Sequence, residues 1–148
     1  MRLAAVFLFE QMCKPRLSHI QIKVRNLDES IEFYKRYLGM NLIERIGDQY
    51  AFLSTDDRHH QLALQCAGRQ APRAPSNSTG LYLVAFEIPD KASFVSAYKL
   101  LTSAGIETVL VDHLISWAIN FSDPDGNGLE ISWDTRSEPG GQPFWRGR

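Results

Sequence analysis

Residues 123 to 132, DPDGNGLEIS, begin as a turn and end as a strand. Successive side chains of a strand point to opposite faces, so Leu129 and Ile131 share one face and Glu130 lies on the other. The two apolar residues suit a buried face. The stretch therefore predicts a half-buried strand that holds one acid, Glu130, on the face turned away from the core.

The chain repeats one pattern twice. Residues 17–24 (LSHIQIKV) and residues 81–88 (LYLVAFEI) alternate as strands do, and each run leads into a helical pattern followed by a glycine. The helices are predicted at residues 28–38 and 91–104. Three strand-like runs follow each helix: NLIERI, QYAFLS and HHQLALQ in the first half, and ETVLV, SWAINFS and LEISW in the second.

Each of these βαβββ units is unable to bury its sheet alone, so two of them should pack as a pair. The predicted fold is α+β, with two βαβββ modules that pair into an open, barrel-like cleft. The predicted domain covers residues 17–134, divided into module one (17–66), a linker (67–80) and module two (81–134), with an N-terminal extension (1–16) and a tail (135–148) outside it.

Superposing the two repeats relates four strand positions. His19 corresponds to Leu83, and Ala63 corresponds to Glu130. Since the aliphatic residues of these strands should face the helices, the four related side chains are predicted to point into the cleft. His19 is then the natural companion of Glu130.

Composition limits the partners. The chain has 148 residues, is 44% hydrophobic and 22% charged, and is long enough for one domain with a core. A net charge of -1 gives no basic footprint, so neither nucleic acid nor an anionic membrane is expected as a partner. A small molecule or another protein is expected instead. Cys13 and Cys66 form no CxxC pair, which favours a reducing compartment and a cytoplasmic location.

The N-terminal apolar run is interrupted by Glu10, which leaves it too short to span a bilayer. Two interpretations stay open for it: an extra edge segment, or an upstream start with Met12 as the natural first residue.

The repeat, the motif DPDGNGLEI, the opening LSHIQIKV and the helix ending YLGM resemble the vicinal oxygen chelate superfamily of glyoxalases, bleomycin-resistance proteins and extradiol dioxygenases. The resemblance covers about residues 17 to 134. Within the superfamily, HHQLAL and DHLISWAINFSDPDGNGLEISWD are most similar to extradiol ring-cleavage dioxygenases. Paired βαβββ modules in that superfamily form a cleft that usually holds a divalent metal.

The resemblance assigns roles to four residues. His19 takes the place of the first histidine ligand and Glu130 that of the carboxylate ligand, and two histidines with one carboxylate suit Fe(II). His60 falls where the family keeps a base-like histidine, and His113 where it keeps a histidine near substrate and oxygen. A histidine suits such proton transfer because its ordinary pKa lies near neutrality.

Two positions depart from the dioxygenase pattern. The second histidine ligand would stand at Leu83, which cannot bind a metal, and the expected tyrosine would stand at Asn120, which cannot act as an acid. Strand alternation also leaves open whether His59 or His60 reaches the cleft. The resemblance thus implies Fe(II) or another divalent metal bound weakly or not at all, with Leu83, Ala63, Asn120 and His59 lining the ligand cleft. Glyoxalase chemistry is less favoured, because Ala63 and Leu83 remove two of its four ligands.

The implied function is that of an extradiol-dioxygenase-like oxidoreductase acting on a small catechol-type aromatic with a divalent metal and O2, with turnover left open. The alternative is a metal-free protein that binds an aromatic ligand or drug in the same cleft. A partner-binding subunit is a third hypothesis.

Sheet edges of such modules pair between chains, so a homodimer is one expected assembly. Taken without the resemblance, Glu130 would be a solvated acid, His19 a hydrogen-bonded histidine, and His60 and His113 surface or loop residues.

Two further patterns have simpler interpretations. DPDGNGLEISWD approximates a calcium-binding loop, but its last position is Asp134 and its flanks alternate like strands, so a turn is predicted instead. Trp117 alternates with Ile119 and Phe121 and is therefore predicted to lie in the core.

Overall fold

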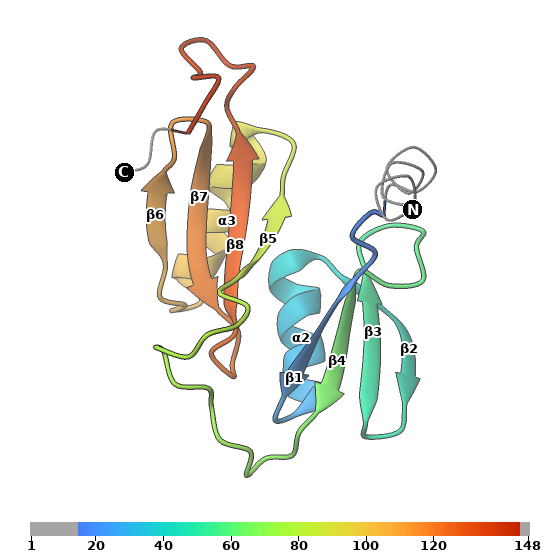
Figure 1. The fold of residues 1–148 in the computed structure, drawn as a ribbon. Coiled ribbons are helices and arrows are strands. Elements are labelled where there is room, and N and C mark those ends of the chain that lie inside the picture. Colours follow the sequence, from blue (N-terminus) through green and yellow to red (C-terminus); the bar gives the residue numbers. More distant parts are fainter. Residues whose placement is uncertain (1–14, 146–148) are drawn as a thin grey trace, which may run out of the picture.

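A computed structural model describes residues 15–145 of the chain (Figure 1). Nearly all of the predicted N-terminal extension, including Met12 and Cys13, lies outside the described residues. The elements of module one are β1 (Ile20–Val24), α2 (Leu27–Leu38), β2 (Asn41–Ile46), β3 (Tyr50–Ser54) and β4 (Leu62–Cys66). Those of module two are β5 (Val84–Glu87), α3 (Lys91–Ser103), β6 (Val109–Asp112), β7 (Ser116–Ser122) and β8 (Gly128–Asp134).

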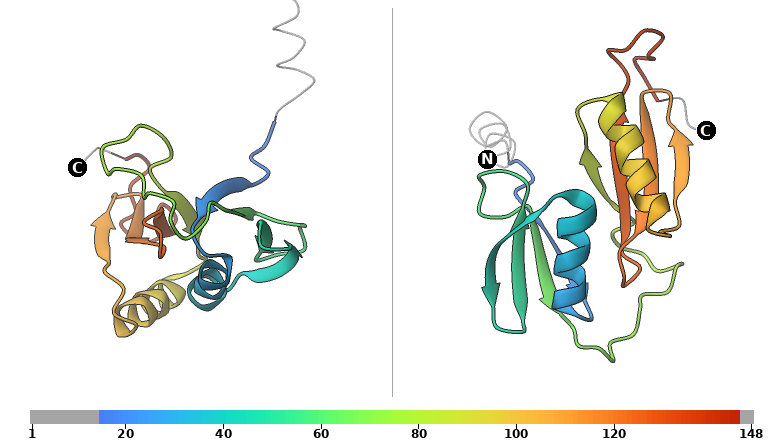
Figure 2. Two further views of the ribbon diagram at one scale, coloured as in Figure 1. Left: turned by 90° about the horizontal axis from the view of Figure 1, so that it is seen from below. Right: turned by 180° about the vertical axis from the view of Figure 1, so that it is seen from behind.

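The α+β fold of two βαβββ modules is confirmed. Each module forms its own four-stranded sheet, with the orders β1-β4-β3-β2 and β5-β8-β7-β6. The first and last strands of a module pair in parallel, and the other pairs are antiparallel. The sheets do not close into a barrel, and both helices lie behind them on the same side (Figure 2). The other side of each sheet, here called its open face, carries neither α2 nor α3.

Local sequence sets the ends of both helices. The Asn26 side chain accepts a hydrogen bond from the backbone N–H of Asp28 at the start of α2, and Gly39 ends that helix with a φ of 63°. At the start of α3, the Asp90 carboxylate accepts from the backbone N–H of Ser93 at 2.7 Å. Both helices begin within one residue of their predicted positions. In the described chain, no helix combines the length and the apolar character needed to cross a membrane.

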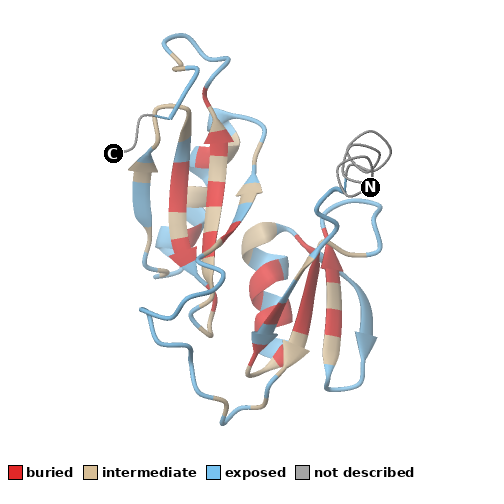
Figure 3. Ribbon diagram, viewed as in Figure 1, coloured by how far each residue is buried: buried red, intermediate tan, exposed pale blue. Residues whose placement is uncertain are grey.

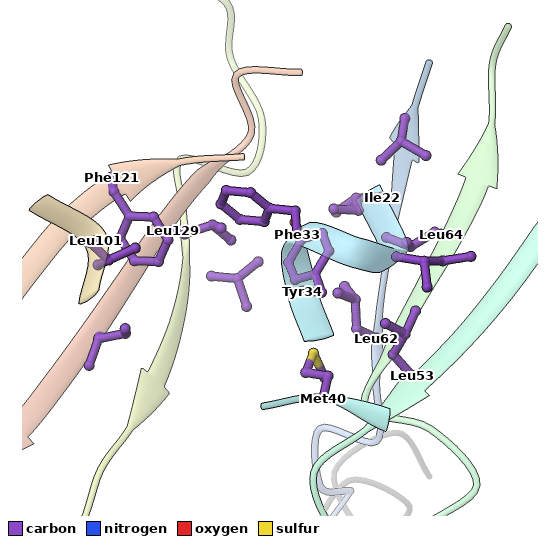
Figure 4. Close-up of a cluster of buried hydrophobic side chains, with 14 of the residues drawn as sticks. Ile22, Phe33, Tyr34, Met40, Leu53, Leu62, Leu64, Leu101, Phe121 and Leu129 are labelled. Atoms are coloured by element: carbon purple, nitrogen blue, oxygen red, sulfur yellow. The ribbon is translucent and has the colours of Figure 1, made fainter. Parts of the chain in front are cut away.

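One hydrophobic core runs through both modules. Its buried side chains come from α2, α3 and the helix-facing residues of the inner strands, while β2 and β6 at the outer edges are largely exposed (Figure 3). Phe33 of α2 reaches across to Phe121 of β7, with 6.4 Å between ring centroids (Figure 4).

Trp117 lies on the predicted helix-facing side, but the prediction that it belongs to the core is wrong. Its side chain is 46% exposed, because it stands near the end of the sheet beside Phe94.

The turn at the start of the DPDGN motif joins the modules through Asp123, which is buried. One carboxylate oxygen of Asp123 accepts hydrogen bonds from the backbone N–H groups of Asp125 and Asn127, both at 2.9 Å. The other oxygen accepts from the Tyr34 hydroxyl of α2 at 3.1 Å. Burial, and then the neighbouring Asp123, raises the pKa of Tyr34, so this tyrosine stays a donor. The Asp123 carboxylate is therefore committed to the turn and to module one.

Asp125 adds a second link of this kind. Its carboxylate accepts from the backbone N–H of Arg25 at 2.8 Å and forms an ion pair with the Arg25 side chain at 3.0 Å. The Asn127 side chain donates to the carbonyl of Lys23 at 3.3 Å. The three polar residues that resemble calcium ligands are thus engaged in protein contacts.

We expect Asp123→Ala to lower the free energy of unfolding by about 3 kcal/mol, because it leaves the Tyr34 hydroxyl and two backbone N–H groups without their acceptor. Urea unfolding followed by tryptophan fluorescence measures the change. The control is Asp48→Ala, whose side chain is 98% exposed and whose loss should shift stability by less than about 0.5 kcal/mol. Equal effects of the two substitutions would contradict a structural role for Asp123.

Candidate functional site

The open faces of the two sheets carry the residues singled out from the sequence. In module one, register places Gln21 and Phe52 on either side of Ala63. Because Leu62 and Leu64 are core residues, Ala63 must face the open side, as predicted, where neighbouring side chains bury it completely. It forms part of the floor of this face and offers no metal ligand.

Three histidines gather over this floor. The ring centroid of His60 lies 4.4 Å from that of His19 and 4.9 Å from that of Phe52. His59 also packs on Phe52, at 5.6 Å, and its Nε2 lies 2.9 Å from a carboxylate oxygen of Glu44. Residues 55–61 form a loop without strand structure, so strand alternation does not apply and both histidines reach the same side as Phe52. His60, however, is the one in contact with His19.

The surroundings of His60 favour its neutral form. Burial, and then the nearby His19 and His59, lower the pKa of His60 from its ordinary value. A neutral imidazole can accept a proton, which is the property that the base-like role requires.

Glu130 is the centre of a second group, on the open face of module two. Register places it between Ala85 of β5 and Asn120 of β7, while Leu129 and Ile131 are buried on the helix side as predicted. Its side chain is only 14% exposed, and one carboxylate oxygen lies 3.8 Å from Nε2 of His113.

Asn120 adds an unsatisfied acceptor to this group. Its buried side-chain oxygen accepts no hydrogen bond from any residue between 15 and 145. Leaving such an atom without a donor costs about 1 to 3 kcal/mol, so this face is suited to receive a donor from a ligand. The structure thus brings together His113, Asn120 and Glu130.

Leu83, the position of the missing histidine, lies just before β5 and beside Gly128, whose added Cβ would stand 3.2 Å from that of Leu83 and 2.3 Å from the carbonyl oxygen of Tyr82. Only a residue without a side chain allows this approach, which explains why a glycine stands at position 128 of the DPDGNGLEI motif.

The described residues do not complete a metal centre. Among residues 15–145, no group of three or more histidine, cysteine, aspartate or glutamate side chains is arranged to hold an ion. His19 stays with the histidines of module one, the one ion pair of Glu130 within residues 15–145 is with His113, and Leu83 supplies no donor. A site of two histidines and one carboxylate is therefore incomplete, and no reaction step through a metal follows from this arrangement.

A cavity of about 490 Å³ opens beside His19, at the gap between β1 and β5. Its polar lining includes Arg58, Gln61 and Glu87, and its apolar lining includes Tyr37 and Phe86. Arg58 and Glu87 were not singled out from the sequence, because only the pairing of the modules brings the 55–61 loop to the edge of β5. Glu130, His60 and His113 are not among the residues that line it.

Comparison with known proteins identifies the family. Residues 16–131 match the model of the Glyoxalase/Bleomycin resistance protein/Dioxygenase superfamily, and the chain belongs to that superfamily. Over 127 residues it is 31% identical to biphenyl-2,3-diol 1,2-dioxygenase 3 of Rhodococcus globerulus, a match that covers 84% of this chain and 66% of the relative. It is 33% identical over 119 residues to catechol-2,3-dioxygenase of Bacillus subtilis, covering 80% of this chain and 41% of the relative. The chain is thus dioxygenase-like, and it matches only part of each relative's length.

Solved structures agree on the fold. A glyoxylase/bleomycin resistance protein/dioxygenase domain from Frankia sp. superposes with a TM-score of 0.70 at 20% identity, covering 82% of this chain and 99% of that one. A fosfomycin resistance protein from Mesorhizobium loti superposes with a TM-score of 0.63 at 20% identity, covering 85% and 98%. At such identities the likeness shows a shared fold and says nothing about chemistry.

Gly128→Ala should lower the free energy of unfolding by about 1 to 3 kcal/mol, because the new methyl group collides with backbone atoms of Tyr82. Thermal unfolding followed by circular dichroism would measure it. Ser122, the exposed register partner of Gly128, provides the control: Ser122→Ala should leave stability within about 0.5 kcal/mol. A Gly128→Ala protein as stable as this control would refute the close approach of Leu83 to β8.

Proposed function

We propose that this chain is an extradiol-dioxygenase-like protein that takes a small catechol-type aromatic on the open face of module two, beside a degenerate metal site. The observation that carries the proposal is the group of His113, Asn120 and Glu130, with a largely buried carboxylate, a histidine 3.8 Å away and an acceptor that has no donor within residues 15–145. The relatives named as biphenyl-2,3-diol and catechol dioxygenases support the choice of substrate class.

The chemistry of this group suits a diol. One catechol hydroxyl would donate to the Asn120 side-chain oxygen and the other to the Glu130 carboxylate, and both acceptors lie on neighbouring strands at paired positions. Nε2 of His113, 3.8 Å from a carboxylate oxygen of Glu130, would accept the proton that the second hydroxyl releases. His60 is proposed as a further base on the other module, with His59 and Ala63 beside it.

His19 and Glu130 are the proposed ligands of the remaining metal site, for Fe(II) or another divalent ion. When bound, such an ion would supply chelation of the two substrate oxygens and activation of O2. Because Leu83 removes one donor, weak binding is part of the proposal. A cytoplasmic location and a homodimer formed through the exposed edge strands β2 and β6 are proposed with it.

A metal-free binding protein is the second candidate. Leu83 favours it, since an apolar side chain at a ligand position makes the site better suited to hold an aromatic ring than to hold an ion. The incomplete set of donors within residues 15–145 favours it as well. Under this hypothesis His113, Asn120 and Glu130 bind the diol, and no oxygen is consumed.

Isothermal titration with catechol and 2,3-dihydroxybiphenyl under anaerobic conditions tests diol binding. Glu130→Gln should weaken catechol binding by about tenfold or more, because a charged acceptor becomes neutral. The matched control is Glu32→Gln, which changes an exposed acid of α2 and should leave affinity unchanged. Equal affinity of the wild type and Glu130→Gln for catechol would show that catechol does not bind on this face.

Leu83→His tests whether the metal site is degenerate. If His19 and Glu130 are its remaining ligands, restoring a donor at position 83 should raise Fe(II) affinity by at least about tenfold, because each ligand contributes at least that much. Anaerobic Fe(II) titration would measure the gain, with Leu83→Asn as a control of similar polarity, and oxygen uptake with catechol would report turnover. Unchanged Fe(II) affinity would contradict the degenerate site and leave the binding protein as the better account.

A further inference from the structure

A second cavity, of about 450 Å³, lies on the helix side of module two, on the opposite face of the sheet from Glu130. Its walls are α3, the helix-facing residues of β6 to β8, and the segment that follows β8. This volume is typical of small-molecule sites, which measure roughly 300 to 1,000 Å³. The proposed dioxygenase-like function makes no use of it.

Aromatic side chains form its walls. Trp117 and Trp133 are register partners on β7 and β8, and both strands have seven residues where their counterparts in module one have five. The ring of Phe94 from α3 stands edge-on to Trp117 at 6.3 Å and lies 6.4 Å from that of Trp133. Tyr98 lines the cavity one helical turn further along. The half-exposed Trp117 therefore belongs to a built aromatic wall.

The segment after β8 closes one side of this cavity. The backbone N–H of Thr135 donates to the carbonyl of Ile115 at 2.9 Å, which fixes the segment to the β6–β7 turn. Gly141 packs so closely that an added Cβ would lie 1.9 Å from the carbonyl oxygen of Thr135. Leu114, in the same turn, has a φ of 67°, a strained conformation for a residue with a side chain. The wall is thus held in place before any ligand arrives.

The charges at this cavity favour a cation. Among residues 15–145, Asp112 and Glu138 line it, against a single ammonium group, that of Lys91. One carboxylate oxygen of Asp112 accepts from the backbone N–H of Leu114 at 2.7 Å. The Asp112 Oδ2 atom and the Glu138 carboxylate have no hydrogen-bond partner or ion pair within residues 15–145. Two carboxylates and two indole rings that line one cavity can together stabilise an organic cation, through charge pairing and cation–π attraction.

We infer that this cavity, walled by Phe94, Trp117 and Trp133 and carrying Asp112 and Glu138, is a binding site for a small organic cation with an aromatic body, such as a protonated aryl amine or an aryl quaternary ammonium. The site is separate from the open face, so it can be tested whatever the outcome of the catechol experiments.

The test follows the indole N–H signals of the full-length protein by NMR during titration with benzyltrimethylammonium. Benzyl alcohol serves as the neutral ligand and benzenesulfonate as the anionic one. The signals of Trp117 and Trp133, assigned by substitution, should move with the cation and saturate, with affinity for it at least about tenfold above that for benzyl alcohol. Trp117→Leu, which keeps an apolar side chain at a half-exposed position, should weaken cation binding by about tenfold.

Two further variants separate charge from packing. Asp112→Asn combined with Glu138→Gln keeps the acceptor for Leu114 and should abolish the preference for the cation over benzyl alcohol. Glu107→Gln, an exposed acid outside the cavity, should leave that preference intact. Equal responses to cation, alcohol and sulfonate, or no movement of either indole signal, would overturn the assignment. So would signals that change with protein concentration alone, because a second chain would then occupy the cavity.

Discussion

The buried hydrogen bond from Tyr34 to Asp123 is the interaction on which the arrangement of the molecule depends. The two sheets share no strand pairing, so side chains set their relative position: those of the hydrophobic core that runs through both modules, and the polar contacts of the turn at Asp123. Asp123 fixes its own turn through two backbone N–H groups and reaches module one through the tyrosine. Asp125 supports the same contact through Arg25. The turn before Glu130 therefore does two things at once: it starts β8 and it ties β8 to the other module.

This constraint explains how the candidate chemistry is distributed. The histidines near His19 lie on module one, and Glu130 with His113 lies on module two, so each sheet contributes one half of a possible site. Leu83 stands where the dioxygenase pattern has a histidine, and it gives the second half no further donor. What remains is a histidine group on one open face and the group of His113, Asn120 and Glu130 on the other. On the helix side of module two lies an aromatic cavity that shares no residue with the candidate metal site.

Much of this could be predicted from the sequence, because alternation and helical spacing are local properties. The two modules, the helix ends near Gly39 and Asp90, and the outward direction of Glu130 all follow from such patterns. The position of His60 did not, since residues 55–61 are a loop to which strand alternation does not apply. Nor did the exposure of Trp117, which depends on its place near the end of the sheet, or the place of Arg58 in the cavity beside β5, which depends on the pairing of the modules. Long-range packing decides these features, and local sequence patterns do not predict such packing.

A double-mutant cycle on Tyr34→Phe and Asp123→Ala tests the central claim most directly. The free energy of unfolding of the wild type, the two single variants and the double variant gives the coupling between the side chains. A shared buried hydrogen bond predicts a coupling of about 1 to 3 kcal/mol, so that the double variant is scarcely less stable than Asp123→Ala alone. Effects that add to within about 0.3 kcal/mol would mean that the two residues act independently and that another contact positions the modules.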